Sequence, residues 1–397
     1  MKIVHIAPNA PYNDYWGYQD NLLPKYQKKL GHDVTIIITD KMHKDGKIVE
    51  TDCADYVLND GVRVIRRAYK KYPAGVVTRN FYDLDVLPLL EEISPDFIFY
   101  HGLLSYTIKD VVKYVKKHPS CRVVEDNHLD YNIGERADTL KKKAVRAWRR
   151  WLNRTTVPYV AKVYGVTPWR KTYAEDYFRI PADKTDVLIM GADDEKVDLA
   201  GKDGIRRRIR EKYKMSDTDF LIVTGGKIDR KKGIDILAEA CAEMEQNVKL
   251  LIFGRIADDV KEKMEALTAQ HDNIIYIGWI DADRVYDYFF AADLVFFPGQ
   301  HSVLWEQACA SKVPCVFEKW EGMEHVNNGG NAEFIAPVDV NTIKDEIRAL
   351  LYTDRYYRMK QVAESEATDI YMYSKIAEKS LECAAGAREK ESNAEQN

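Results

Sequence analysis

Short apolar runs alternate with stretches in which apolar residues recur at helical spacing along most of this chain. Residues 2–7 have the pattern of a buried strand, and residues 20–30 that of an amphipathic helix that stops at Gly31. The alternation continues with strands expected at residues 34–39, 62–66, 97–100, 122–125 and 161–166, and helices at 84–93 and 105–117. Elements of these lengths in this order predict a parallel sheet covered by helices on both faces.

A second series follows a stretch around residues 180–200 in which the periodicity lapses and Pro, Asp and Gly accumulate. Its strands are expected at residues 220–223, 248–253, 274–277, 294–297 and 314–317, and its last helices at 340–352, 356–366 and 374–385. The pattern therefore predicts an α/β protein of two doubly wound domains that face a central cleft.

The predicted domains are residues 1–180 and 200–369. Residues 370–387, which include the last helix, are expected to cross back and complete the first domain. The polar segment 388–397 is expected to be a disordered tail.

Composition narrows the class of protein. The 397 residues suffice for two hydrophobic cores. The net charge of −4 conceals a basic first half, because residues 1–190 hold 31 Lys and Arg against 24 Asp and Glu, whereas the rest holds 28 against 39. The six cysteines have no metal-ligand spacing, and no apolar run approaches the length of a membrane span. The sequence begins directly with a strand pattern, so we expect no signal peptide, reduced thiols and a cytoplasmic protein.

A glycine-rich basic loop organises the second domain. Residues 223–233 read VTGGKIDRKKG, and an apolar strand precedes them while a helical run follows. Gly225 and Gly226 can adopt dihedral angles closed to other residues and let a ligand approach the main chain. The lysines and the arginine of the loop place positive charge beside a helix N-terminus, which itself favours anions. The stretch predicts a phosphate-bearing ligand, although a solvated basic loop would have the same composition.

Polar residues also follow the predicted strands of the first domain. In doubly wound sheets, ligands lie beyond the carboxyl ends of the strands. These ends carry residues 8–17, His101 and Gly102, and the group Asp126 to His128. His101 could bind a sugar or an attacking hydroxyl, or could simply cap its strand. Asp126 and His128 could orient an acceptor or act as a base, or form an ordinary loop cluster.

Five segments in order resemble the retaining glycosyltransferases of family four, which have the GT-B fold. The segments are MKIVHIAPNAPYNDYWGYQDNLLPKYQKKLGHDVTIII, TGGKIDRKKGIDIL, LLIFGRI, IIYIGWIDADRVYDYFFAADLVFFPG and SVLWEQACASKVPCVF. Each is a weak pattern alone, but together they cover nearly the whole chain. The resemblance implies a GT-B glycosyltransferase of the bacterial polysaccharide and glycan-assembly type.

The resemblance also implies roles for individual residues. In that family a lysine and an arginine hold the diphosphate of a sugar nucleotide, and a final glutamate binds the ribose hydroxyls. The matching positions are Lys232, Lys227 and Glu306. His101 matches a histidine on the acceptor side of the cleft. Further donor contacts are expected at Gly17, Gly225, Gly226, Gly254, Gln300, His301 and Ser302.

This chain departs from the family pattern in two places. Lysine stands at position 227 where arginine is usual, which keeps the charge but loses the planar fork. The stretch between Pro298 and Glu306 is shortened, and the first glutamate of the family's Glu-x7-Glu pattern is absent. Gln300, His301 and Ser302 occupy that region instead, so the identity of the donor sugar stays open.

A basic stretch in the first domain is not explained by this resemblance. Residues 141–154 hold seven basic residues and no acid. Val145, Trp148, Trp151 and Leu152 fall on one face of the predicted helix. The pattern is typical of a helix that lies on an anionic membrane, but a core-facing apolar stripe with a solvated basic back fits it as well. No nucleic-acid recognition motif accompanies the charge.

The sequence thus predicts a cytoplasmic, retaining hexosyltransferase-type glycosyltransferase (EC 2.4 class), peripheral to the inner leaflet if residues 140–154 bind membrane. We expect a nucleotide-diphospho-sugar donor, with a UDP-sugar favoured and GDP-mannose as the alternative. The expected acceptor is a glycan, lipid-linked if the basic helix binds membrane. No cofactor, metal or nucleic acid is expected. The rival hypotheses are a sugar-nucleotide epimerase of the same fold and a non-catalytic sugar-nucleotide-binding subunit of a transferase.

Overall fold

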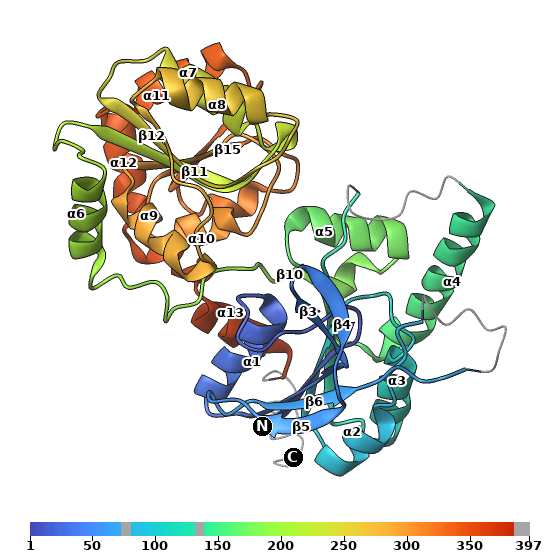
Figure 1. Cartoon of the computed structure of the whole chain (residues 1–397). Helices are drawn as coiled ribbons and strands as arrows, with labels where there is room; N and C mark the ends of the chain where they lie inside the picture. The colour runs from blue at the N-terminus through green and yellow to red at the C-terminus, as the bar shows by residue number, and fades with distance from the viewer. Residues whose placement is uncertain (73–80, 132–138, 385–397) are drawn as a thin grey trace. The chain divides into compact units, whose positions relative to one another are not determined.

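The computed structural model describes residues 1–72, 81–131 and 139–384, and the chain divides into two compact units (Figure 1). The first unit contains Met1–Ile189 and the segment that begins at Ile376, and the second contains Met190–Lys375. The division falls within the stretch 180–200 where the periodicity lapses. The predicted tail 388–397 lies outside the described residues.

The first unit is built on one eight-stranded sheet in the order β10-β9-β8-β7-β1-β2-β6-β5. The strands are β1 (Lys2–Ala7), β2 (Asp33–Thr39), β5 (Ala54–Val57), β6 (Arg63–Arg67), β7 (Phe97–His101), β8 (Arg122–Asn127), β9 (Lys162–Gly165) and β10 (Thr185–Val187). All neighbours run parallel except β5, which pairs antiparallel with β6. A separate antiparallel hairpin is formed by β3 (Lys41–Lys44) and β4 (Lys47–Glu50).

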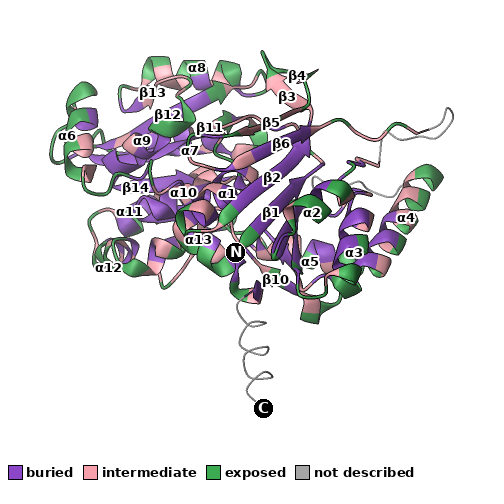
Figure 2. Cartoon of the chain, turned by 90° about the horizontal axis from the view of Figure 1, so that it is seen from below, coloured by how far each residue is buried: buried purple, intermediate pink, exposed green. Residues whose placement is uncertain are grey.

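The helices of this unit are α1 (Gln19–Lys29), α2 (Leu87–Ile93), α3 (Ile108–Lys117), α4 (Leu140–Thr156) and α5 (Pro168–Tyr173). They form where the sequence supplies an apolar face. In α3, for example, Ile108, Val111 and Val115 are buried against the sheet, whereas the lysines face outward. Figure 2 shows the buried strands β1 and β2 and the mostly exposed outer end of α4.

The second unit is a six-stranded parallel sheet in the order β13-β12-β11-β14-β15-β16. The strands are β11 (Phe220–Ile228), β12 (Val248–Ile256), β13 (Ile274–Tyr276), β14 (Leu294–Phe297), β15 (Cys315–Glu318) and β16 (Ala332–Ile335). The helices are α6 (Lys202–Lys212), α7 (Ile234–Ala242), α8 (Lys261–Gln270), α9 (Val285–Ala291), α10 (Leu304–Ala310), α11 (Val340–Leu350) and α12 (Asp354–Ala363). Numbered within the unit, the strands follow the order 3-2-1-4-5-6 of a dinucleotide-binding sheet.

Helix α13 (Tyr373–Ser380) carries the chain from the second unit into the first. Within the first unit, the Gln27 amide donates to the Ser380 hydroxyl at 2.9 Å, and the Tyr164 hydroxyl lies 3.5 Å from the Cys383 sulfur. The C-terminal segment therefore packs into the first unit. Among the described residues, none of the helices combines the length and the apolar content that crossing a membrane requires.

The structure corrects the sequence-based elements in several places. Strand β11 does not end at residue 223 but continues through both glycines to Ile228. The strands β3, β4, β5, β10 and β16 were not expected, because they are short and several are largely exposed, which leaves no continuous apolar run to reveal them. The helix expected at residues 84–93 begins only at Leu87, although Leu84 and Val86 are buried.

Candidate functional site

The strand order of the second unit reverses direction between β11 and β14, and ligands of doubly wound sheets bind beside such a reversal. Two loops leave the sheet there. The first runs from Ile228 to the start of α7, and the second from Phe297 to the start of α10. They touch, because the Gln300 amide donates to the Lys231 carbonyl at 3.0 Å and a side chain on Gly299 would meet the Lys232 carbonyl carbon at 2.3 Å. Of the predicted donor-binding residues, Lys232, Gln300 and His301 therefore lie close together at this edge.

Lys232 is fixed by the second loop. Its ammonium donates to the backbone carbonyls of Gln300 and His301, and burial lowers the pKa of its side chain. An ammonium has three donors, so two are used and a third remains for an anion. Lys227 differs, since its side chain is 70% exposed and pairs with Asp229 at 2.8 Å, which raises its pKa.

The glycines of this region are required by close packing. A side chain on Gly225 would lie 2.4 Å from the Phe253 ring, and one on Gly254 would lie 1.8 Å from the Gly226 carbonyl oxygen. Gly233 begins α7 in the left-handed region with φ 62°. The sequence hypothesis placed Gly225 and Gly226 in a turn. In the structure they lie within β11, where the missing side chains let β11 and β12 approach.

Glu306 lies in the first turn of α10 and is completely buried. One carboxylate oxygen, Oε1, accepts from Nε2 of His301 and from Nε2 of His325, both at 2.8 Å. Burial alone would raise the pKa of Glu306, but the two imidazoles outweigh burial and hold this pKa well below its usual range. The other oxygen, Oε2, is buried without a hydrogen-bond partner. A buried unpaired carboxylate oxygen is an acceptor ready for ligand hydroxyls.

Sequence reasoning missed His325. It lies in a short turn (Glu324–Val326) that follows β15, the next strand in the sheet after β14. The signal that could have found it is its place after a strand end, the same signal that singled out His101. Gln300 and Ser302 lie in the loop between β14 and α10, as their sequence positions require.

The first unit has its own cluster where β7 and β8 end. Asp126 is fully buried, and its Oδ2 atom lies 2.9 Å from Nδ1 of His101 and 3.2 Å from Nε2 of His128. Its Oδ1 atom accepts from the Gly102 amide at 2.9 Å. Burial alone would raise the pKa of Asp126, but His128 and His101 hold it far below its usual range. Asp126 is therefore a carboxylate that positions its neighbours.

Both ring nitrogens of His101 are engaged in hydrogen bonds. The Ser380 hydroxyl uses its one proton to donate to the Ala377 carbonyl, so it accepts from the Gln27 amide nitrogen. The Gln27 amide oxygen therefore faces His5 and accepts from its Nε2 at 2.7 Å. Burial lowers the pKa of His5 to about 3, so His5 is neutral and its Nδ1 accepts from Nε2 of His101 at 3.0 Å. This chain of donors was not foreseen, because His5 lies inside a buried strand.

His101 consequently donates through both nitrogens, to His5 and to Asp126, and carries a positive charge. Burial would lower the pKa of His101, but the Asp126 carboxylate outweighs burial and raises it. A doubly protonated imidazole cannot accept a proton, so His101 is not available as a general base. His128 is the accessible member of the cluster, since its side chain is 43% exposed and one ring nitrogen remains beyond the bond to Asp126.

Each cluster also brings together three potential metal ligands, with ligand atoms within 4.8 Å of one another. The two groups are His101, Asp126 and His128, and His301, Glu306 and His325. In both, imidazole nitrogens lie at hydrogen-bond distance from a carboxylate oxygen, and this accounts for the arrangement. Independence of metal stays a prediction. Gly17 lies between β1 and α1, and no other atom comes within 4 Å of where its side chain would begin.

Comparison with known proteins agrees with this architecture. Residues 205–366 match the family model described as glycosyl transferases group 1. An uncharacterised glycosyltransferase of Methanocaldococcus jannaschii is 21% identical over 79% of each chain. A lipopolysaccharide 1,2-N-acetylglucosaminetransferase of Salmonella typhimurium is 22% identical over 55% of this chain and 60% of that protein.

Solved structures show the same fold over nearly the whole chain. A glycosyltransferase of Rickettsia africae matches with a TM-score of 0.69 at 17% identity, covering 97% of this chain and 98% of the other. Anabaena HepE in complex with UDP matches with a TM-score of 0.66 at 17% identity, covering 97% and 100%. A UDP-GlcNAc 2-epimerase of Neisseria meningitidis matches less well, with a TM-score of 0.57 at 14% identity over 97% and 100%.

These findings define the class of protein. The chain has the GT-B fold of two Rossmann-like α/β domains, and residues 205–366 of its second unit match the glycosyl transferases group 1 model. Family and relatives together support glycosyl transfer. They leave the donor, the acceptor and the stereochemical course open.

Proposed function

We propose that this protein is a retaining glycosyltransferase that transfers a sugar from a nucleotide-diphospho-sugar to a saccharide acceptor. One observation carries the proposal: Lys232 and the N-terminus of α7 lie at the first loop beside the strand reversal, and Glu306, with its unpaired Oε2, lies in α10 directly after the second loop. A UDP-sugar is the favoured donor because HepE, which shares the fold, binds UDP. GDP-mannose is the alternative donor.

The diphosphate and the ribose of the donor have separate partners in this proposal. The diphosphate is anionic and suits the third donor of Lys232 together with the free amides at the start of α7. The ribose hydroxyls suit Oε2 of Glu306, since hydrogen bonds to a carboxylate are strong and the oxygen has no other partner. His301 and His325 then act as positioning residues, because they fix the carboxylate through its other oxygen.

The proposed transfer is a same-face substitution. The acceptor hydroxyl oxygen forms a bond to the anomeric carbon as the bond from that carbon to the diphosphate oxygen breaks. The hydroxyl proton passes to the departing diphosphate, so no covalent enzyme intermediate is formed. Charge builds up on the diphosphate during this step, and Lys232 with the helix N-terminus stabilises it electrostatically. Lys227 is exposed and can turn from Asp229 toward the same charge.

The cluster of the first unit is proposed to act on the acceptor. His128 presents an accessible ring to a sugar hydroxyl, while the charged His101 holds Asp126 ionised behind it. A lipid-linked saccharide of surface-glycan synthesis is the proposed acceptor, supported by the likeness to a lipopolysaccharide transferase. We place the reaction in the cytoplasm, with attachment to the inner leaflet through residues 140–154.

The test is nucleotide release from a panel of UDP-, GDP-, ADP- and TDP-sugars by wild type, Lys232→Met and Lys231→Ala. Lys231 is an exposed lysine of the same loop, and Lys231→Ala removes the same charge as Lys232→Met. We expect one donor family to be turned over, with Lys232→Met slowed about a hundredfold and Lys231→Ala close to wild type. Equal rates in all three proteins would refute the assignment of Lys232.

A sugar-nucleotide epimerase is the second candidate, favoured by the structural likeness to UDP-GlcNAc 2-epimerase. The same panel distinguishes the two. An epimerase would convert the sugar without any saccharide acceptor, whereas a transferase would leave the donor sugar's configuration unchanged and release nucleotide faster when acceptor is present.

A third candidate is a non-catalytic subunit, and the shortened loop between Pro298 and Glu306 supports it. Such a subunit would bind the nucleotide without turnover.

A further inference from the structure

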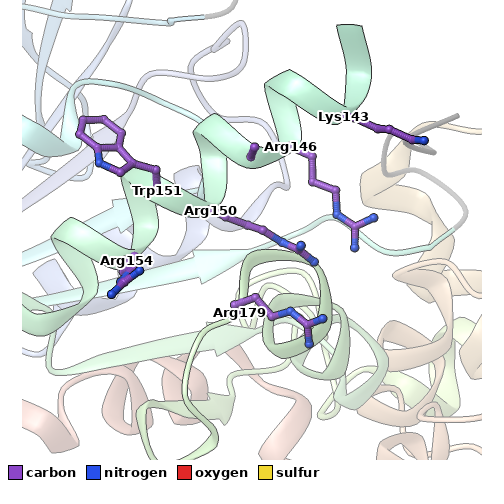
Figure 3. A pocket seen from close by; sticks show the side chains of 7 residues that line it. Lys143, Arg146, Arg150, Trp151, Arg154 and Arg179 are labelled. Atoms are coloured by element: carbon purple, nitrogen blue, oxygen red, sulfur yellow. The ribbon is translucent and has the colours of Figure 1, made fainter. Parts of the chain in front are cut away.

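A hollow of about 760 Å3 lies along the outer face of α4 in the first unit (Figure 3). Its charged and aromatic lining consists of Lys143, Arg146, Arg150, Trp151, Arg154 and Arg179. Among the described residues that line it, none is acidic. We refer to it as the basic hollow.

The helix geometry separates the basic hollow from the core. Lys143, Arg146, Arg150 and Arg154 follow one another at helical spacing along one face of α4. The other face is used for packing: Leu152 is buried in the core, and Trp148 packs against Phe81 and Tyr106. Trp148 and Leu152 therefore do not face a membrane, which corrects the interfacial hypothesis for these two residues. Trp151 remains exposed, at 51%.

Two guanidinium groups are held in place without neutralising their charge. Arg150 donates to the backbone carbonyls of Tyr177 at 2.8 Å and Asp176 at 3.2 Å, and Arg146 lies 4.8 Å from the centre of the Tyr177 ring. Burial and the nearby charges of Arg146 and Arg179 lower the pKa of Arg150. Within the described part of the chain, none of these arginines forms an ion pair. A bound anion would relieve their mutual repulsion.

Arg179 reaches the hollow from a different segment. It follows a turn of π-helix (Ala174–Phe178), and its own backbone is left-handed with φ 62°. This conformation is costly for a residue other than glycine, and both such outliers and π-turns concentrate at functional sites. In Figure 3, Arg146 and Arg150 extend to the same side of α4, toward Arg179.

A second, mostly apolar hollow of about 240 Å3 adjoins the first, and Arg154 and Arg179 line both. Its apolar lining is formed by Val157, Pro158, Ile180 and Pro181, with Asn153, Asp183 and Lys184 completing it. A cationic hollow beside an apolar one fits a molecule that has an anionic group next to hydrocarbon.

We propose that these two hollows form a binding site for the phosphate group of a lipid. The phosphate oxygens are held by the guanidinium groups of Arg146, Arg150 and Arg179, whose planar forks match phosphate geometry, and the adjoining hydrocarbon enters the apolar hollow. The lipid is either a phospholipid of an anionic bilayer or the lipid phosphate of a lipid-linked saccharide. The site sharpens the proposed membrane attachment from a charged helix surface to a defined pocket.

The test uses decyl phosphate below its micelle-forming concentration, measured by titration calorimetry. The site variant is Arg146→Ala/Arg179→Gly, which removes two of the three proposed phosphate ligands, and glycine suits the left-handed backbone at position 179. The matched control is Lys44→Ala/Lys141→Ala, which removes two exposed charges of the same unit outside the hollow. Decyl glucoside, which has the same hydrocarbon without charge, and inorganic diphosphate complete the set of probes.

We expect wild type and the control to bind decyl phosphate alike, more tightly than decyl glucoside or diphosphate. The site variant should lose roughly tenfold in affinity for each guanidinium removed. Equal binding by the site variant and the control would overturn the proposal in favour of diffuse charge attraction. Absence of decyl phosphate binding in wild type would overturn it as well.

Flotation with vesicles identifies the source of the phosphate. Binding to phosphatidylcholine vesicles doped with phosphatidylglycerol identifies a phospholipid, and binding only when a polyprenyl phosphate is added identifies the lipid-linked saccharide. In either case the site variant should float less than the control, and equal flotation contradicts the proposal. The proposal does not depend on the sugar donor, so the site variant should keep wild-type nucleotide release, and failure of either hypothesis is recognised separately.

Discussion

The two carboxylate oxygens of Glu306 have different surroundings. Oε1 receives two imidazole donors and Oε2 receives none, although both are buried. This asymmetry distinguishes Glu306 from an acid that merely stabilises a helix N-terminus, for which no pair of histidines would be needed. Two histidines distant in sequence thus position one carboxylate and leave one oxygen for a ligand.

Glu306→Gln and Lys232→Met should affect different parts of a nucleotide. Glutamine places an amide donor where a hydroxyl needs an acceptor, so Glu306→Gln should weaken binding of UDP and of uridine by a similar factor, roughly tenfold. Lys232→Met should weaken UDP and leave uridine unchanged, because uridine has no phosphate. Calorimetric titration measures both. A Glu306→Gln protein with wild-type affinity for uridine would contradict the ribose assignment.

The pKa of His5 makes stability depend on pH. Its folded pKa is lowered from 6.5 to about 3, so between these values the unfolded chain binds a proton that the folded chain does not. Its contribution to stability is therefore present above pH 6.5 and is lost as the pH falls toward 3. The pKa of His101 is raised in the folded state, so its contribution to stability has the opposite pH dependence: it is present at low pH and is lost at higher pH.

His5→Gln should accordingly lower the free energy of unfolding at pH 7. It should also make the free energy of unfolding fall less as the pH becomes acidic. The measurement is urea unfolding at pH 7 and at pH 5, with His43→Gln as control, since His43 lies in strand β3 and is only partly buried. The difference in free energy of unfolding between the two pH values should shrink in His5→Gln. An unchanged difference would show that His5 is protonated in the folded state.

At the scale of elements, the strands that could be predicted are those whose whole length is buried. Strands β1, β2 and β7 are rich in apolar residues and are buried on both faces after at most one exposed residue, as parallel strands covered by helices require. The hairpin of β3 and β4 has no fully buried residue, so no apolar run reveals it. Tertiary pairing, which a single sequence does not display, decides such elements.

The candidate site divides in the same way. Lys232 could be singled out because a strand, a basic loop and a helix follow one another locally, whereas Glu306 was found through the resemblance of residues 302–317 to a known family. The pairing of His325 with Glu306 and of His5 with His101 could not be predicted, because it comes from the order of strands in the sheet. The interpretation of His101 changes once these partners are known, from a residue that binds a sugar or an attacking hydroxyl to a buried cation.

The close approach of β11 and β12 gives a prediction at this scale. Gly254→Ala should destabilise the second unit by about 1–3 kcal/mol or more, since its side chain would overlap the Gly226 carbonyl and its φ is 122°. Gly204→Ala is the matched control. Gly204 lies inside α6 with open space around it, so alanine there should stabilise by about 1 kcal/mol. Chemical unfolding measures the change in the free energy of unfolding, which should be a decrease for Gly254→Ala and an increase for Gly204→Ala.

At the scale of the whole molecule, the two units carry different chemistry on the same architecture. The second has the fixed lysine and the half-satisfied glutamate of a nucleotide site, and the first has the cluster of Asp126 and the basic hollow. This agrees with the charge of the sequence, whose first half is basic and second half acidic. A basic first unit suits a lipid phosphate, whereas the acidic second unit depends on the local charge of Lys232 and of a helix N-terminus to bind an anionic nucleotide.

The most direct measurement is the shift of the thermal unfolding midpoint of wild type and Lys232→Met with UDP-, GDP-, ADP- and TDP-sugars. A ligand of the native state raises the midpoint according to its occupancy. We predict a clear rise with one nucleotide family, UDP first, that is largely lost in Lys232→Met. A wild-type protein that no nucleotide stabilises would contradict the central claim that the loops after β11 and β14 form a nucleotide-sugar site.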